Sequence, residues 1–443
     1  MSEVTEVLQR ATQLLDMALD AGADEADVYL RQGPATRITL QQDHCNESSG
    51  WQSGLALRVW CDDRLALLST NDLSAAGLAT IARQAVLEAR QRGISSPAWL
   101  NSERSCSPFA LAQEPLLAQA RKRAMIEEVM ATISSKQPAT GLIVHACYAE
   151  STSFTGLVNS RGLRAVCQTS NYRIWIWAEG AFGHLTTAAS SQCFAGLDLE
   201  ALGQHVSDHL VFLHEPSRQA PAGPCEVLLP PLAAADIARS LGVLLTAENV
   251  LQDLKPLLKS IDHPIASPAV SLIDDGALHT GLKSRPFDDE GTPVSATTLV
   301  EQGRLRAFLH TLRSADLLNA TPGGNALKPS LWQQPRAAPS NVYLQAGNAT
   351  PDELRQQLQH GIIVTSVLRP GRIQGTTGKF TLVVQGWWIE QGQPRYPVSG
   401  VPISANIFEL LRNVRACGSD LQFSPLADGA GAPSLLIARV QVG

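Results

Sequence analysis

Residues 141–178 read GLIVHACYAESTSFTGLVNSRGLRAVCQTSNYRIWIWA, and this stretch decides the fold class. Its apolar residues gather in short runs, as those of strands do, at 141–149, 154–158, 162–168 and 171–178. Asn159-Ser160-Arg161-Gly162 separates two of these runs, and its Asn and Gly suit a tight hairpin turn. Because so short a turn joins antiparallel strands, the stretch predicts an antiparallel sheet.

The rest of the first half adds strands and amphipathic helices to this sheet. Strand-like runs lie at 26–31, 36–40 and 54–60. Helices are expected at Val4–Ala21, from Asn71-Asp72 onward, at Pro115–Ser134 and at Leu199–Leu213. The second of these helices carries six apolar residues on one face, namely Leu78, Ile81, Ala82, Ala85, Val86 and Ala89. We therefore expect a sheet that buries one face against helices.

A Pro- and Gly-rich segment divides the chain near its middle. Residues 216–224 contain Pro216, Pro221, Gly223 and Pro224, which is the composition of a linker. A chain of 443 residues also exceeds the roughly 250–300 residues at which a single core stops growing. We expect an N-terminal domain over 1–215 and a C-terminal domain over 225–443, joined by this linker.

The second half contains more short strand-like runs than helices. These runs lie at Glu226–Leu229, Ala296–Glu301, Leu305–Thr311, Asn341–Gln345, Gly361–Val367, Lys379–Ile389 and Leu435–Val442. Their spacing favours antiparallel pairing over regular βαβ alternation. The predicted fold class is α+β, with an N-terminal α/β domain of antiparallel strands and helices.

The charge balance argues against a protein that binds nucleic acid directly. Lys and Arg total 35 against 41 Asp and Glu, a formal net charge of -6. The densest basic run, Arg121-Lys122-Arg123, is soon followed by Glu127 and Glu128. We interpret it as a solvated helix face of mixed charge.

Other features favour a cytoplasmic protein. No apolar stretch approaches the roughly 18 consecutive residues of a membrane span, so no membrane association is expected. The opening residues Met1–Glu6 are acidic and amphipathic, unlike a signal peptide. The eight cysteines are scattered without a CxxC pair, which fits reduced thiols.

Nine segments, taken in order, resemble the TldD/PmbA family, whose members were once named modulators of DNA gyrase. The segments are Gly54–Val59, Ser69–Leu73, Asn159–Gly162, Arg285–Gly291, Leu299–Gly303, Gly323–Ala326, Asn341–Gly347, Gly375–Phe380 and Tyr396–Gly400. The resemblance implies two domains, the second built on a large antiparallel β-sheet. It also implies a two-chain metalloprotease, in which a TldD-like chain pairs with a PmbA-like (TldE-like) chain.

The resemblance further implies that a TldD-like catalytic chain carries HExxxH on a helix just after the linker. The two histidines bind zinc, and the glutamate activates the metal-bound water. We align this motif with Pro230–Arg239, where Ala233, Ala234 and Ala238 occupy the three functional positions. Alanine cannot bind zinc, so the chain is identified as PmbA/TldE-like, with no catalytic residue, metal or cofactor of its own. Zinc is expected in the TldD-like partner.

Histidines elsewhere are weaker candidates for a site. His214-Glu215 precedes Pro216 in the linker and is interpreted as a coincidental match. His205 and His209 stand four residues apart on a predicted helix, a spacing that can hold a metal, but no third ligand is evident. His310 could act as a base toward a serine, although no GxSxG motif is present.

Three further segments contain candidate side chains. Asp288-Asp289-Glu290 could form a carboxylate site, but acidic residues before Gly291 favour a turn. Cys417 is interpreted as structural, and Gly431–Ser434 is the segment that aligns with the third zinc ligand of a TldD-like chain.

Three functions therefore remain in competition. The first is a non-catalytic subunit that forms a heterodimer with a TldD-like metalloprotease and helps to hold flexible peptides for proteolysis or peptide maturation. A homodimer of the chain alone is left open. The second is an independent peptidase or hydrolase with an unrecognised site. The third is a regulatory binding protein of a DNA-handling partner.

Overall fold

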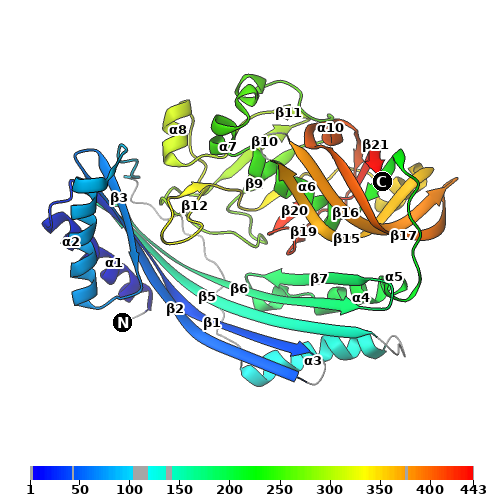
Figure 1. Ribbon diagram of the computed structural model, residues 1–443, viewed down its shortest axis with the longest axis horizontal. Helices are drawn as coiled ribbons and strands as arrows, with labels where there is room; N and C mark the ends of the chain where they lie inside the picture. Colours follow the sequence, from blue (N-terminus) through cyan, green and yellow to red (C-terminus); the bar gives the residue numbers. More distant parts are fainter. Residues whose placement is uncertain (1–2, 42–43, 103–117, 136–141, 375–377, 443) are drawn as a thin grey trace.

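A computed structural model describes residues 3–41, 44–102, 118–135, 142–374 and 378–442 (Figure 1). It confirms the α+β fold class, because helices pack on large, mainly antiparallel sheets. Residues 25–191 contribute one seven-stranded sheet, and residues 223–442 contribute two six-stranded sheets and a small two-stranded one. The large antiparallel sheet that the family resemblance implied for the second half is present, and it is accompanied by a second six-stranded sheet.

The N-terminal sheet has the strand order β4-β3-β2-β1-β5-β6-β7, and every neighbouring pair is antiparallel. Its strands are β1 (Glu25–Gln41), β2 (His44–Cys61), β3 (Arg64–Thr70), β4 (Ile94–Ser95), β5 (Ile143–Asn159), β6 (Arg164–Glu179) and β7 (His184–Ser191). The predicted runs at 26–31 and 36–40 belong to the single strand β1, and the four predicted runs of 141–178 belong to the two strands β5 and β6. The polar residues between the runs remain paired across the ladder, so they do not end the strands.

The hairpin at Asn159–Gly162 is confirmed. The Asn159 side-chain oxygen accepts hydrogen bonds from the backbone N–H groups of Arg161 (3.0 Å) and Leu163 (3.1 Å). Gly162 has a φ of 94°, a left-handed conformation that glycine adopts without a steric penalty. The turn therefore sets the register of β5 against β6.

Helices cover one face of this sheet, in two groups. They are α1 (Glu3–Asp20), α2 (Ala75–Arg92), α3 (Gln119–Ser135), α4 (Leu199–Asp208) and the short α5 (Val211–His214). The helices α1 and α2 pack on one end of the sheet, and α3 and α4 on the other (Figure 1). All six residues predicted for the buried face of α2 are buried, although the helix is capped by Ser74 rather than by Asn71-Asp72. The helix predicted at Leu199–Leu213 is interrupted at His209.

The opposite face of the sheet is turned toward the C-terminal half (Figure 1). Alternate side chains of β1 and β2 reach this face, and Tyr29 and Ala56 pack there with Leu157, Leu163 and Phe287. Phe287 belongs to the second half of the chain. A small apolar cluster thus joins the two halves.

The C-terminal half contains many short elements. They are β8 (Gly223–Leu229), α6 (Pro231–Leu244), α7 (Ala247–Gln252), η2 (Lys255–Ser260), β9 (Leu272–Asp275), β10 (Ala296–Glu301), β11 (Arg304–Leu305), α8 (Leu312–Leu318), β12 (Ala326–Leu327), β13 (Arg336–Ala337), β14 (Val342–Leu344), α9 (Pro351–Gln357), β15 (His360–Gln374), β16 (Lys379–Glu390), β17 (Gln393–Asn406), α10 (Ile407–Arg412), β18 (Val414–Cys417), β19 (Gln422–Ser424), β20 (Ala430–Ala432) and β21 (Leu435–Val442). The 3-10 helix η1 (Phe194–Gly196) precedes α4.

The helix α6 lies between the two six-stranded sheets, which have the orders β17-β16-β15-β8-β21-β18 and β11-β10-β9-β14-β20-β19. The strand predicted at Leu305–Thr311 is wrong beyond Leu305, because the chain leaves the ladder and Thr311 caps α8. The strand β17 contains three prolines and was not predicted. The expected domain limits at 215 and 225 stay a prediction.

The interpretation of Arg121-Lys122-Arg123 as a solvated face is wrong for Lys122. Arg121 and Arg123 are exposed, and Arg123 pairs with Glu127 at 2.8 Å. Lys122 instead points inward and forms an ion pair with Glu150 of β5, whose side chain is 0% exposed. The pair attaches α3 to the sheet. No helix within the described ranges is long and apolar enough to cross a membrane.

We expect Lys122→Met to lower the free energy of unfolding by about 3–5 kcal/mol, because Glu150 would be left as an unpaired buried charge. Guanidinium unfolding would measure this loss. The double variant K122M/E150Q should recover most of it, and the exposed control R121M should change stability by less than about 0.5 kcal/mol. Equal effects of R121M and K122M would contradict the buried pair.

Candidate peptide groove and the α6 helix

The sequence after β8 folds as a buried helix because it is rich in alanine and begins with proline. Pro231 lies in the first turn of α6, where its missing N–H costs nothing. Eleven of the fourteen residues of α6 are buried, so the helix meets packed side chains on nearly every side. An unbroken α-helix extends from Pro231 to Leu244.

Ala233, Ala234 and Ala238 lie on α6 and are 1%, 0% and 0% exposed. They belong to the apolar core that fills the space between the two sheets. On a regular helix a five-residue step turns the chain by about 140°, so positions 233 and 238 point in different directions. These three positions thus carry no ligand atom, are buried, and lie on a regular helix.

The polar side chains of α6 bind the backbone of β15 instead. Asp236 accepts a hydrogen bond from the N–H of Gly371 (3.2 Å), and Arg239 donates one to the carbonyl of Gly371 (2.6 Å). Burial raises the pKa of Asp236, and nearby Arg239 opposes this shift. Within the ranges that the structure describes, no group of three or more His, Cys, Asp or Glu side chains is placed to hold a metal.

The pair His205 and His209 lies at the end of α4, where the two rings stack at 4.2 Å. The ring nitrogens of His209 are 2.6 Å from the carbonyl oxygen of His205 and 3.0 Å from that of Thr365 in β15. Burial, with a smaller contribution from His209, lowers the pKa of His205 to about 4. The pair joins α4 to β15 rather than presenting two free nitrogens to a metal.

Asp288-Asp289-Glu290 forms a turn, as the sequence predicts, and Gly291 follows with a φ of 80°. The Asp288 carboxylate accepts hydrogen bonds from the N–H groups of Glu290, Thr292 and Ala326, each at 2.9 Å. Unlike most turns this one is buried, and desolvation raises the pKa of Asp288 to about 6. Nothing in the local residue pattern indicates this burial.

Cys417 and Ser434 have structural contacts. The Cys417 thiol donates a hydrogen bond to the carbonyl of Ala269 (3.2 Å), and burial raises its pKa to about 11. Ser434 donates through its N–H (2.9 Å) and hydroxyl (2.7 Å) to the Asp420 carboxylate. These bonds fix the loop between β18 and β19 against β21.

The structure brings His310 within 3.4 Å of the Ser314 hydroxyl, a pair that the sequence analysis did not identify. Both residues are buried, at 5% and 2% exposure. The Ser314 hydroxyl accepts a hydrogen bond from the N–H of Thr311 (2.9 Å) as part of the capping box of α8. The serine hydroxyl is therefore engaged in capping α8.

A groove follows the face of the N-terminal sheet that is turned toward the C-terminal half. Three adjoining cavities of about 630, 360 and 360 Å³ are connected by shared wall residues. Gln52 and Ser151 line the first and second, Tyr29 and Arg31 line the second and third, and Asn171 lines the first and third. The second and third are also lined by C-terminal residues, which include Lys328 and Arg285. The groove thus runs along the strands and under the second half of the chain.

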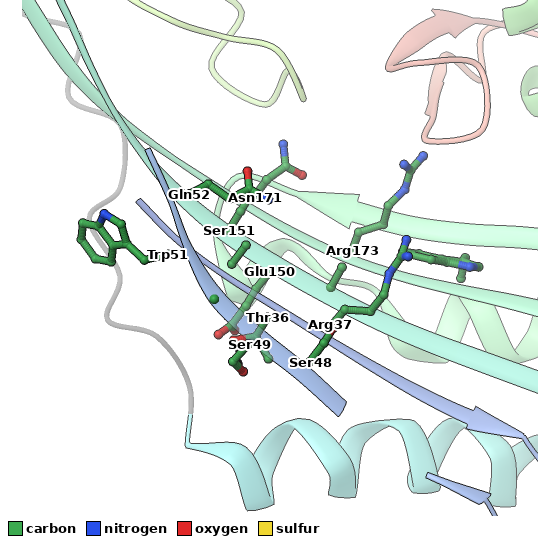
Figure 2. A pocket seen from close by; sticks show the side chains of 14 residues that line it. Thr36, Arg37, Ser48, Ser49, Trp51, Gln52, Glu150, Ser151, Asn171 and Arg173 are labelled. Carbon is green, nitrogen blue, oxygen red and sulfur yellow. Dashed lines mark hydrogen bonds between the residues drawn. The ribbon is translucent and has the colours of Figure 1, made fainter. Parts of the chain in front are cut away.

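The wide end of the groove is basic. Figure 2 shows Asn171 and Arg173 on the side of the sheet away from α3, whereas Ser49 and Glu150 lie on the side of α3. The guanidinium groups of Arg37 and Arg173 lie 5.1 and 5.8 Å from the ring centre of Trp175. These groups suit extended chains with acidic side chains or a terminal carboxylate.

Residues 222–443 match the family model of the PmbA/TldA metallopeptidase C-terminal domain, which is half of the chain. The chain belongs to the TldD/PmbA metalloprotease family. The family membership predicted from the sequence is confirmed over residues 222–443, which contain the aligned HExxxH positions.

Relatives of this family member match it over different lengths. A metalloprotease of Methanothermobacter thermautotrophicus is 26% identical, over 96% of this chain and 97% of its own. A PmbA homologue of Buchnera aphidicola, also named a metalloprotease, is 25% identical, over 45% of this chain and 41% of its own. TldE from Thermococcus kodakarensis is 15% identical and has the same fold, with a TM-score of 0.86 over 98% of this chain and all of that one.

The packing around α6 yields a test in this TldD/PmbA chain. We expect Ala234→Glu to lower the free energy of unfolding by more than about 3 kcal/mol, because it places a carboxylate in a full apolar core. The matched control Ala124→Glu, on the exposed face of α3, should cost less than about 0.5 kcal/mol. A stable A233H/A234E/A238H variant that bound zinc, measured by metal analysis after dialysis, would show that room for a metal remains.

Proposed function

We propose that this chain is the non-catalytic, PmbA/TldE-like subunit of a two-chain metalloprotease in which a TldD-like partner holds the zinc. The observation that carries the proposal is the state of the aligned motif positions. Ala233, Ala234 and Ala238 offer no ligand atom, and the surrounding core leaves them 0–1% exposed. A hydrolytic zinc needs protein ligands and an open position for water. The chemistry is therefore assigned to the partner, and this chain supplies structure and binding.

The groove supports a role in holding flexible peptides. Arg31 and Arg37 both lie on β1, an even number of residues apart, so their side chains are on the same face of the sheet. Arg173 adds a third cation from β6. Charged and aromatic side chains along strands can bind an extended chain without requiring one sequence. Lys328 also lines the groove, and burial lowers its pKa to about 8. Substrates in a flexible, extended state fit this surface better than folded proteins.

The two competing functions receive less support. An independent hydrolase would need an accessible nucleophile, and Ser314 beside His310 is buried and occupied. A regulator of a DNA-handling protein would need a binding surface for that partner. No contact in the described residues indicates such a surface. The subunit proposal alone accounts for both the alanines of α6 and the groove.

The test is to purify the chain alone and co-expressed with a TldD-like protein from the same genome. We expect zinc and cleavage of an unfolded peptide only in the pair, and none in the chain alone. The control is the pair with its HExxxH glutamate changed to glutamine, which should keep zinc and lose activity. Zinc-dependent cleavage by the chain alone would overturn the proposal.

A second test addresses the groove. In the active pair, Arg37→Gln should raise KM for an acidic unfolded peptide roughly fivefold, since one charge-assisted contact of about 1 kcal/mol is lost. Both kcat and zinc content should stay unchanged. Arg83→Gln, on the exposed side of α2, is the control and should leave KM as it is. An unchanged KM in R37Q would remove the groove from the proposed function.

A further inference from the structure

A separate cavity of about 600 Å³ lies between the two halves of the chain, away from the groove. Its N-terminal wall includes Trp60 of β2 and Leu65 of β3, followed by Trp99. Its C-terminal wall comes from α7 and α8, and α8 lies at the end of that half nearest to β3 (Figure 1). Neither the aligned motif nor the peptide groove accounts for this cavity.

Two carboxylates, Glu248 of α7 and Glu290 of the buried turn, line the cavity and are oriented by neighbouring residues. The Thr311 hydroxyl donates a hydrogen bond to Oε1 of Glu248 (2.9 Å). The N–H of Leu312 donates one to Oε2 of Glu290 (2.8 Å). Adjacent residues at the start of α8 thus hold one oxygen of each carboxylate in place.

The second oxygen of each carboxylate lacks a hydrogen bond within the described part of the chain. Oε2 of Glu248 is buried and has no partner. Oε1 of Glu290 lies 4.0 Å from Nη1 of Arg58, too far for a hydrogen bond, and the Glu290 side chain is only 5% exposed. Buried charged groups are normally paired, so this arrangement indicates a missing donor.

Two cations, Arg58 and Arg313, also line the cavity, and each has contacts with other side chains. Arg58 donates two hydrogen bonds from Nε to Asp27 (2.9 and 3.1 Å) and a third from Nη2, and its Nη1 donates to Gln334 (3.3 Å). Arg313 is exposed and lies over the ring of Trp99 at 5.5 Å. Burial raises the pKa of Glu290 to about 8, against the opposing charge of Arg58. Arg58 therefore does not offset the cost of burying the Glu290 carboxylate, and a further cation beside it would favour the charged form.

Apolar and aromatic side chains form another part of the cavity wall. They include Trp60, Trp99, Leu65, Leu251 and Leu317. A hydrated divalent metal ion is poorly matched to such walls, because it needs a shell of oxygen ligands. An aliphatic stem with a cationic head fits both features, since the stem packs on the rings and the head reaches the carboxylates.

We propose that this cavity binds an alkyl cation, a primary ammonium or guanidinium group on an aliphatic stem, with its charge held between Glu248 and Glu290. The cation comes either from a small free amine or guanidine or from a Lys or Arg side chain of a peptide. The proposal is independent of the zinc-holding partner, because every residue in it belongs to this chain.

Titration calorimetry on the full-length chain tests this site. We expect butylguanidinium or agmatine to bind with a Kd below about 1 mM, and the neutral analogue butylurea to show no binding. Glu248→Gln and Glu290→Gln should each weaken binding at least about tenfold. The control Glu200→Gln, on an exposed turn of α4, should bind as the unaltered chain does.

Capped peptides that contain a single Arg, or citrulline in its place, distinguish the two sources. Tighter binding of the Arg peptide than of agmatine assigns the site to a peptide side chain, and the reverse assigns it to a free amine or guanidine. If E290Q fails to fold, as thermal melting would show, E248Q alone decides. Absence of binding by every cationic ligand at about 10 mM, or equal binding by E248Q and the unaltered chain, overturns the proposal.

Discussion

The burial of α6 between two six-stranded sheets is the constraint on which the C-terminal half depends. Two sheets that pack on one helix need that helix to be apolar on nearly all sides, and only small side chains let both sheets approach it closely. Ala233, Ala234 and Ala238 satisfy this requirement. The same packing leaves these three positions almost without exposed surface.

The contact between the two halves follows a different principle, because it is rich in buried charge. Asp27 and Arg58 pair across adjacent strands of the N-terminal sheet, and the turn at 288–290 approaches them from the other half. Most of these charges are compensated by backbone N–H groups or by each other, as burial demands. Glu248 and Glu290 are the exception, which is why the cavity beside them differs from the groove along the sheet.

The groove and the cavity differ in the charged groups that line them. Arg31, Arg37 and Arg173 follow the strands of the groove, whereas the cavity contains Glu248 and Glu290 together with Arg58 and Arg313. Strand alternation places Arg31 and Arg37 on one face, since every second residue of β1 points to the same side of the sheet. The start of α8 places the two carboxylates of the cavity, since the consecutive residues Thr311 and Leu312 each donate a hydrogen bond to one of them.

Features that depend on local spacing could be predicted from the residue pattern alone. These include the buried face of α2, the hairpin at 159–162 and the turn before Gly291, because helical periodicity and turn chemistry act over a few residues. The identity of the residues at positions 233, 234 and 238 also needed no coordinates. Which charged side chains are buried became evident only from the three-dimensional packing. The local sequence around Lys122 predicts a surface residue, but in the folded chain Lys122 pairs with the buried Glu150. Glu248 and Glu290 are far apart in sequence, and hydrogen bonds from Thr311 and Leu312 at the start of α8 hold both. Burial and pairing arise from long-range packing, which local patterns do not record.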